Sequence, residues 1–278
     1  MKVIAESSST RTEWLLTDGN LVVAHAVTGG LNPYFQSRRE ISHCIRLELP
    51  SEFFKRRWDH VHYYGAGCAN QEKCKLMEQS LVAQFKTPVT VESNLLAAAR
   101  GLFVREPGLA CIIGTGTNSC TYNGERIIKN VRSLGFILGD EGGGSYMGKR
   151  FISDCLKGLA PKKLAEAFFD EYKIRVDDVM DKVYTGSLVP VVLANYANFL
   201  AHNVDNPYVY KLIYDGFMEF FHRNIISYNY SDYKIGVVGR IAAKFEPILH
   251  KAANDFGVQL FKVCETPLKG LVEYHSQI

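Results

Sequence analysis

The sequence of 278 residues has no CxxC pair, and its seven cysteines are scattered along the chain. Several cysteines lie inside apolar stretches such as 109–113, which favours buried free thiols in a reducing compartment. The eight histidines show no HExxH spacing, and His60 and His62 alternate as one face of a strand would. A zinc or iron–sulfur site is therefore not expected, and the histidines are interpreted as structural.

Long apolar runs and a charge bias are also missing. No segment approaches the ~20 apolar residues that span a bilayer, and residues 1–14 contain no apolar run of signal-peptide length. The net charge of +3 is spread over both signs, so neither a nucleic-acid stripe nor a polybasic membrane patch is present. We expect a cytoplasmic protein with one large domain or two medium ones, and no nucleic-acid or membrane partner.

Two common nucleotide motifs are absent as well. The run from Gly143 to Arg150 is similar to a P-loop, but Arg150 stands where Ser or Thr should bind Mg²⁺. A P-loop should also leave a buried strand directly, whereas this run follows another glycine turn. No GxGxxG opens a strand–turn–helix unit, so a dinucleotide-binding fold is disfavoured.

The first hundred residues alternate strand and helix patterns. A three-strand meander is expected first, and Asp18-Gly19 suits a two-residue hairpin loop. The order is typical of helices packed on a mixed sheet in an α/β fold. The expected strands are 3–6, 12–17, 21–27, 61–64 and 89–92, and the expected helices begin at Ser37 and cover 71–85 and 94–104.

The pattern then starts again. A shift of 105 residues places Thr10 on Thr115, Thr12 on Thr117 and Asp18-Gly19 on Asn123-Gly124. Three matches in register within fifteen residues indicate a duplicated architecture with two similar domains. The second half is expected to have strands at 109–113, 119–122, 127–131 and 235–238, and helices at 144–159, 164–172, 188–203, 209–228, from Gly239 to 256, and 270–275.

Each half begins with a turn rich in Ser, Thr and Gly between two strands. Small side chains let backbone N–H groups point at one anion, and hydroxyls add donors, so both turns suit phosphate. Arg11 stands at the rim of the first turn. Such residues also form ordinary hairpin turns, which is the better explanation of either turn alone by about two to one. Their equivalent positions favour phosphate binding.

Two further positions could do chemistry. Asp140 and Glu141 open a helix, where they could hold a ligand hydroxyl or a hydrated cation, or serve only as a helix N-cap and a first-turn acid. Gly239 follows an apolar strand, and the missing side chain would let a flat ring approach the backbone.

Together these segments resemble the BadF/BadG-type ATPases and, among them, the N-acetylglucosamine kinase family, over nearly the whole chain. Five segments match the family in order and approximate spacing: Gly30-Leu31-Asn32-Pro33, Tyr64–Cys68, Leu95–Arg100, Gly114–Ser119 and Gly139–Gly142. The resemblance implies two ribonuclease-H-like domains of the actin-like ATPase type with a cleft between them. They would cover residues 1–105 and 106–264, with a helix at 265–278 packing back on the first.

The same resemblance implies ATP with Mg²⁺ as phosphoryl donor, the 6-hydroxyl of an amino sugar as acceptor, and a homodimer. It puts Mg²⁺ at Glu6, the adenosine at Gly239, and a catalytic contact at Asp140. The residues implied for phosphate are Glu6, Ser9, Thr10, Arg11, Thr12, Gly114, Thr115, Gly116 and Thr117, and those implied for the sugar are Asn32, Thr115, Asn118 and Asp140.

The chain departs from the family at catalytic and nucleotide positions. Asn94 stands where the family has its catalytic aspartate, and a carboxamide cannot take a proton from a hydroxyl. Glu6 replaces an aspartate, and Ser8 replaces a glycine where positive φ could be needed. Arg11 replaces a lysine, and Arg240 replaces a small residue beside the adenosine glycine.

Three hypotheses follow. The first is an ATP-dependent kinase for N-acetylglucosamine or a related amino sugar. The second is a catalytically weakened sugar-binding or regulatory protein that lacks the base. The third, an ATP-driven activator of a radical dehydratase, is disfavoured because the cysteines lack the spacing of iron–sulfur ligands.

Overall fold

The computed structural model describes residues 1–8, 10–68, 70–186 and 188–277. Within it the chain forms two compact units, each described by itself below. The first unit combines residues 1–108 with 122–128 and with the C-terminal segment from Thr266 onward. The second unit contains residues 109–121 and 129–265.

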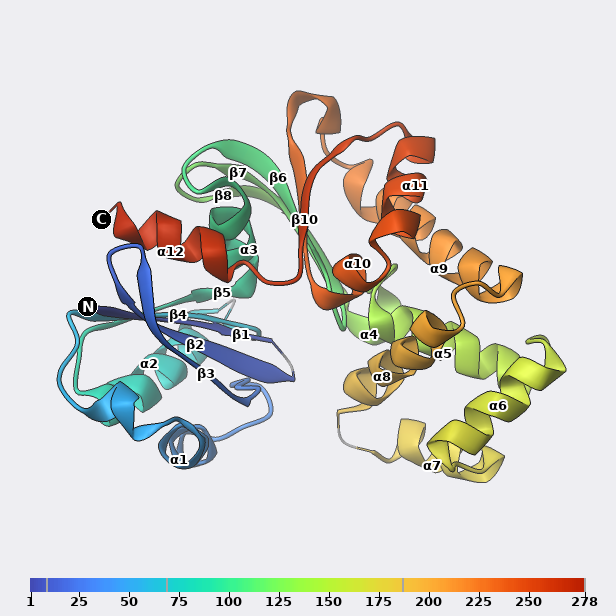
Figure 1. The fold of residues 1–278 in the computed structure, drawn as a ribbon, viewed down its shortest axis with the longest axis horizontal. Coiled ribbons are helices and arrows are strands. Elements are labelled where there is room, and N and C mark those ends of the chain that lie inside the picture. Colours follow the sequence, from blue (N-terminus) through green and yellow to red (C-terminus); the bar gives the residue numbers. More distant parts are fainter. Residues whose placement is uncertain (9, 69, 187, 278) are drawn as a thin grey trace. The chain divides into compact units, whose positions relative to one another are not determined.

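A five-stranded mixed sheet forms the centre of the first unit (Figure 1). Its order is β3-β2-β1-β4-β5, with β1, β2 and β3 antiparallel and β1, β4 and β5 parallel. The predicted three-strand meander is therefore confirmed, but Asp18 pairs with Leu21, so the hairpin loop is Gly19-Asn20. The strands are β1 (Lys2–Ser7), β2 (Arg11–Asp18), β3 (Leu21–Gly29), β4 (His60–Gly65) and β5 (Val89–Ser93).

Alternating side chains give this sheet two apolar faces, because successive residues of a strand point to opposite sides. One face packs on α1 (Arg38–Glu48) and α2 (Gln71–Phe85), and a short 3₁₀ helix (Ser51–Phe54) adds Phe53 to this core. The other face packs on α3 (Asn94–Phe103) and α12 (Leu268–Ser276), which lie side by side in Figure 1.

Short polar side chains begin the helices of this unit. The Ser37 hydroxyl accepts a hydrogen bond from the Glu40 N–H, and the Glu40 carboxylate accepts one from the Ser37 N–H at 2.7 Å. The Asn70 and Ser93 side chains cap α2 and α3 in the same way. Each cap satisfies a backbone N–H that the first helical turn leaves open, which explains why the predicted starts at 71 and 94 are those observed.

The contact between α3 and α12 depends on two glycines. A Cβ at Gly101 would lie 2.5 Å from the Cβ of Pro267, and a Cβ at Gly270 would overlap the carbonyl oxygen of Gly101. The two helix backbones therefore approach more closely than any side chain would permit.

The second sheet has the order β10-β9-β6-β7-β8, which is the order of the first sheet read from the opposite edge. Thus β6 takes the place of β1, β7 and β8 those of β2 and β3, and β9 and β10 those of β4 and β5. This is the duplicated architecture that the 105-residue shift predicts. The strands are β6 (Pro107–Ile113), β7 (Thr117–Asn123), β8 (Ile127–Val131), β9 (Ile235–Val238) and β10 (Leu260–Cys264).

The elements of the second unit differ from the expectations in five places. The predictions lacked α4, α7 and β10. The predicted helix at 209–228 ends its α-helical part at Phe220 and continues as a π-helix (Phe221–Ile225), and the helix after Gly239 is broken at Phe245. The helices are α4 (Gly135–Leu138), α5 (Gly144–Leu156), α6 (Lys162–Tyr172), α7 (Val176–Tyr184), α8 (Val189–His202), α9 (Pro207–Phe220), a 3₁₀ helix (Tyr230–Asp232), α10 (Arg240–Lys244) and α11 (Glu246–Phe256).

All seven cysteines are free; Cys68, Cys111 and Cys120 are buried and the other four are half-buried. Across the described ranges, no helix combines the length and the apolar character that crossing a bilayer requires. In the same residues, no group of three or more His, Cys, Asp or Glu side chains is arranged to hold a metal ion.

We expect Gly270→Ala to destabilise the first unit by about 1–3 kcal/mol, because the added methyl group meets the Gly101 carbonyl and must push α12 away from α3. Urea unfolding followed by circular dichroism measures this loss. Glu273→Ala on the exposed side of the same helix is the matched control, expected within about 0.5 kcal/mol of the parent. Equal stability of the two variants would contradict the close helix contact.

Candidate functional site

The side chain of Ser8 organises the turn between β1 and β2. Its hydroxyl donates to the Arg11 carbonyl at 3.1 Å and accepts from the Thr10 and Arg11 N–H groups, both at 3.4 Å. Ser8 is not among the described non-glycine residues with positive φ, so the expected backbone strain is not found there. Thr10 is exposed at the tip of the turn, and Ser9 lies outside the described residues.

Ser7 and Thr12 hold the base of the same turn. Their hydroxyl oxygens lie 2.8 Å apart, and both residues are buried. The Ser7 hydroxyl also accepts from the Leu31 N–H at 3.0 Å, and the Thr12 hydroxyl donates to the Gly29 carbonyl at 3.0 Å. The turn is thereby joined to the segment that carries Asn32, and Thr12 has a structural role here.

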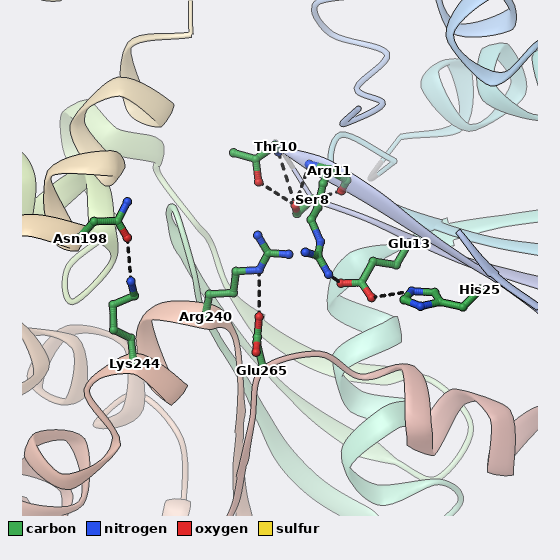
Figure 2. A network of polar contacts seen from close by, with 9 residues as sticks. All are labelled: Ser8, Thr10, Arg11, Glu13, His25, Asn198, Arg240, Lys244 and Glu265. Atoms are coloured by element: carbon green, nitrogen blue, oxygen red, sulfur yellow. Dashed lines mark hydrogen bonds and ion pairs between the residues drawn. The ribbon is translucent and has the colours of Figure 1, made fainter. Parts of the chain in front are cut away.

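Arg11 forms an ion pair with Glu13, two residues further along the same face of β2 (Figure 2). The other Glu13 oxygen lies 3.3 Å from Nε2 of His25 on β3. Glu13 is buried, and Glu6 on β1 is its direct cross-strand neighbour. The cation that the resemblance assigns to phosphate therefore contacts a carboxylate of its own strand.

Two asparagines in the first unit present amide groups. The Asn32 Oδ1 atom accepts from the Tyr34 N–H at 3.0 Å, and a Cβ at Gly67 would lie 2.5 Å from it. Within the described residues the Asn32 Nδ2 group has no hydrogen-bond partner, nor does the half-buried side chain of Asn94. Both amides are free to bind a ligand.

Asn94 is the first residue of α3, and Ser93 is both the last residue of β5 and the helix N-cap. The strand therefore does not reach residue 94. Strand alternation therefore does not place Glu92 and Asn94 on one face. This geometry does not support Glu92 as a replacement for the missing aspartate.

The turn at Gly114–Gly116 in the second unit contains hydrogen-bond donors that could bind a ligand. Among the described residues, the N–H groups of Thr115 and Gly116 and the Thr115 hydroxyl have no hydrogen-bond partner. A Cβ at Gly114 would meet nothing within 4 Å, so the turn borders open space. Backbone N–H groups in such a turn form a concave anion-binding surface.

The Asp140 carboxylate stabilises this turn by hydrogen bonding. Its Oδ1 atom accepts from the buried Thr117 N–H at 3.0 Å and from the Ser133 hydroxyl at 3.3 Å. A Cβ at Gly116 would lie 2.6 Å from both carboxylate oxygens. Burial raises the pKa of Asp140 above its ordinary value, against the lowering effect of its hydrogen bonds.

The start of α5 is tied to the same turn, because the Gly144 and Ser145 N–H groups donate to the Gly114 and Thr115 carbonyls at 2.8 and 2.9 Å. The N-cap is Gly143, not Asp140 as one sequence interpretation held. Asp140 instead lies four residues before the helix, with φ of +60°. Glu141, half-buried, lies 3.7 Å from the Arg223 guanidinium.

Asn118 and Gly239 border the turn from two sides. The Asn118 Oδ1 atom accepts from the Ser119 N–H and from Asn130 Nδ2 at 2.9 and 2.8 Å, which directs its own Nδ2 elsewhere. A Cβ at Gly239, whose φ is +141°, would overlap the Ile113 carbonyl, so only glycine fits there. The next residue, Arg240, lies 3.2 Å from Glu265 (Figure 2).

The donors of the Gly114–Gly116 turn fit the phosphate groups of a nucleotide. Phosphate oxygens need N–H and hydroxyl donors, which Thr115 and Gly116 offer. In the first unit, Glu6 carries a half-buried carboxylate, the kind of group that holds Mg²⁺ together with phosphates and waters.

No protein-family model matches this chain, and no curated protein matches it. Among solved structures, a Porphyromonas gingivalis protein described as a "Putative N-acetylglucosamine Kinase" is 36% identical, with 100% of this chain and 99% of that chain covered and a TM-score of 0.95. The chain belongs to the family of this protein. The BadF/BadG part of the resemblance stays a prediction.

More distant structures agree on the fold. A Chromobacterium violaceum protein with the same description is 14% identical, with 98% of both chains covered and a TM-score of 0.75. A ROK hexokinase from Thermus thermophilus is 15% identical, with 98% and 96% covered and a TM-score of 0.55. The predicted fold class, an α/β protein of the actin-like ATPase type, is confirmed.

The sequence interpretation missed the partners of the site residues. Glu13 could have been found from its spacing, because residues 11 and 13 of one strand share a face. Ser7, Ser133 and Glu265 carry no comparable signal, since their contacts join segments far apart in sequence or follow a turn whose path the sequence leaves open.

We expect Asp140→Ala to cost roughly 2–4 kcal/mol of stability. It leaves the Thr117 N–H buried without an acceptor, and it puts alanine at φ +60°. Asp140→Asn is the matched control, because asparagine keeps the Oδ1 acceptor and tolerates this conformation, so its loss should stay below about 1 kcal/mol. Thermal and urea unfolding compare the two, and similar losses would refute this role of the carboxylate.

Proposed function

We propose that the chain is an ATP-dependent kinase of an amino sugar, with N-acetylglucosamine as acceptor at its 6-hydroxyl. The observation that supports this best is the set of unpartnered donors at Thr115 and Gly116 next to the buried Asp140. A structure described as a "Putative N-acetylglucosamine Kinase" and 36% identical over the full chain supports the same activity. We also propose a homodimer, from the resemblance, and a cytoplasmic location, from the seven free cysteines.

Each residue then has a task. The Thr115 and Gly116 N–H groups and the Thr115 hydroxyl donate to phosphate oxygens, which stabilises charge on the group being transferred. Asp140 accepts a hydrogen bond from a sugar hydroxyl, and the Nδ2 groups of Asn32 and Asn118 donate to sugar or acetamido oxygens. Gly239 gives the adenosine access to the backbone. Mg²⁺ at Glu6 would neutralise phosphate charge.

The side chain at residue 94 limits this chemistry. An amide can orient the acceptor hydroxyl but cannot take its proton. Loss of a general base costs about 10²–10⁴ in rate, although phosphoryl transfer depends mainly on positioning and electrostatics. We therefore propose a slow kinase rather than an inert one.

The second candidate is a sugar-binding or regulatory protein that keeps the sugar residues without turnover. Two observations favour it: Asn94 is a carboxamide, and Arg11 contacts Glu13 on its own strand. Calorimetry with N-acetylglucosamine, and phosphate transfer from Mg²⁺-ATP to a panel of amino sugars, separate the two candidates. Sugar binding without any phosphosugar above background would favour this second candidate over the kinase.

We expect Asn94→Asp to raise the rate of sugar phosphorylation by about 10²–10⁴, because it restores a proton acceptor at the start of α3. Asn70→Asp is the matched control: it makes the same substitution at the N-cap of α2, where aspartate caps equally well, and should leave the rate unchanged. The rate is measured by coupled ADP release with sugar present and absent. An Asn94→Asp variant that binds sugar but transfers no phosphate would refute residue 94 as the position of the catalytic base.

A further inference from the structure

Three histidine rings form a stack between β4 and α12. The ring centroids of His60 and His62 lie 4.4 Å apart, and those of His62 and His275 lie 3.8 Å apart. His275 is only 3% exposed, although it is the eighth residue of a nine-residue helix. The Lys2 ammonium also reaches this helix and donates to the His275 carbonyl at 2.8 Å.

A chain of hydrogen bonds runs from Arg100 through Tyr64 to His275 and favours one neutral tautomer of its ring. The Arg100 guanidinium can only donate, and it donates to the Tyr64 hydroxyl at 2.9 Å. The Tyr64 proton is then directed at Nε2 of His275, also 2.9 Å away. Among the described residues the Tyr64 proton has no other acceptor, so the tautomer that pairs both groups has Nε2 as the unprotonated acceptor. The single ring proton then lies on Nδ1, which is buried without a partner in that part of the chain.

The groups that face His275 disfavour a positive charge there. Lys2 approaches from β1, His60 and His62 from β4, Arg100 from α3, and Arg105 from the segment after α3. Tyr274 of α12 itself is covered by the guanidinium groups of Arg100 and Arg105, at 4.6 and 4.7 Å from its ring.

The titratable neighbours of Tyr64 and Arg100 complete the network. Glu92 on β5 acts on both electrostatically. Burial and the nearby cations lower the pKa of His275 to about 3 and that of His62 to about 2.

The helix that His275 holds is in contact with the helix that begins at Asn94. The Gly101–Gly270 contact puts the two backbones against each other, and Arg100 belongs to α3 while His275 belongs to α12. We propose that His275 is a positioning residue of the kinase: in its neutral form it fastens α12 to α3 and so fixes the first turn of α3, where Asn94 presents its side chain. The catalytic part of this proposal rests on the proposed function.

Protonation of His275 undoes this arrangement. An imidazolium would bring an N–H against the Tyr64 hydroxyl proton and a charge beside Arg100 and Lys2. While α12 is packed on α3 and β4, the His275 ring stays neutral. When α12 detaches, the stacked histidine rings become exposed to water and regain the ordinary histidine pKa of about 6.5. Linkage then raises the population of the released state about 30-fold for each such histidine between pH 7.5 and 5.0.

Amide hydrogen exchange of the whole chain tests this directly, with rates corrected for the intrinsic effect of pH. In the parent we expect the amides of α12, and the Leu96 amide that Ser93 caps in the first turn of α3, to lose at least about 30-fold in protection at pH 5.0, while α2 in the same unit keeps its protection. His275→Gln offers a non-titrating acceptor at the place of Nε2. Between pH 7.5 and 5.0, the loss of α12 amide protection in His275→Gln should be about 30-fold smaller than the loss in the parent.

Controls keep this test decisive. His250→Gln changes a surface histidine of α11 in the second unit and should behave as the parent. Tyr64→Phe removes the donor to Nε2 and should lower the amide protection of α12 already at pH 7.5. This variant tests the same hydrogen bond if His275→Gln does not fold. Equal α12 protection of the parent at both pH values, an unaffected first turn of α3, or an unchanged pH response of His275→Gln would each overturn the proposal.

Sugar phosphorylation provides a separate arm. The parent kcat should fall below pH 6.5 while KM for the sugar changes little, and His275→Gln should move the acidic limb of kcat to lower pH. A parent that transfers no phosphate would refute the proposed function, whereas the exchange experiment would still decide the role of His275 on α12 and α3. An acidic limb that His275→Gln leaves in place would overturn its positioning role.

Discussion

The close approach of backbone to backbone around Gly114–Gly116 is the constraint on which the second unit depends. The Asp140 carboxylate lies where a side chain on Gly116 would be, and the start of α5 donates two N–H groups to the turn. Gly239 lies against the end of β6 without room for any Cβ. Neighbouring residues satisfy the carbonyls of the turn, whereas the Thr115 and Gly116 N–H groups have no partner among the described residues. The donors are held in place before any ligand arrives.

The first unit achieves order by a different route. Its turn between β1 and β2 is stabilised by hydroxyl groups rather than by glycines. Ser8 hydrogen-bonds within the turn, and the Ser7 and Thr12 hydroxyls pair where the two strands meet it. Serine at position 8 adds a hydrogen-bonding side chain without requiring positive φ. The departures from the family pattern in this turn, at Glu6, Ser8 and Arg11, keep the formal charge and change the side-chain shapes and the available donors more than the backbone. Arg11 shows this, since its guanidinium is engaged by the buried Glu13.

Periodicity was enough to predict the strands of both sheets except β10, as well as most helices, because alternation and caps are local. The repeat of Thr10 at Thr115 and Thr12 at Thr117 indicated two similar sheets, and the matching strand orders explain it. What could not be predicted depends on contacts distant in sequence, such as Tyr64 with His275 and Ser133 with Asp140. The sequence predicts a functional role for Asp140, and that stays a prediction; its place before the helix, with Gly143 as N-cap, follows from a turn geometry that composition does not encode.

The discontinuity of the first unit bears on how the chain is made. Residues 266–277 complete this unit, yet they are translated only after the whole second unit. Until then, Ile4, Leu15 and Tyr64 lack the α12 side chains that later cover them. The nascent first unit must therefore wait with the α12-binding part of one apolar sheet face exposed to chaperones or to misfolded contacts. Synthesis order thus gives the last helix a kinetic importance that its short length conceals.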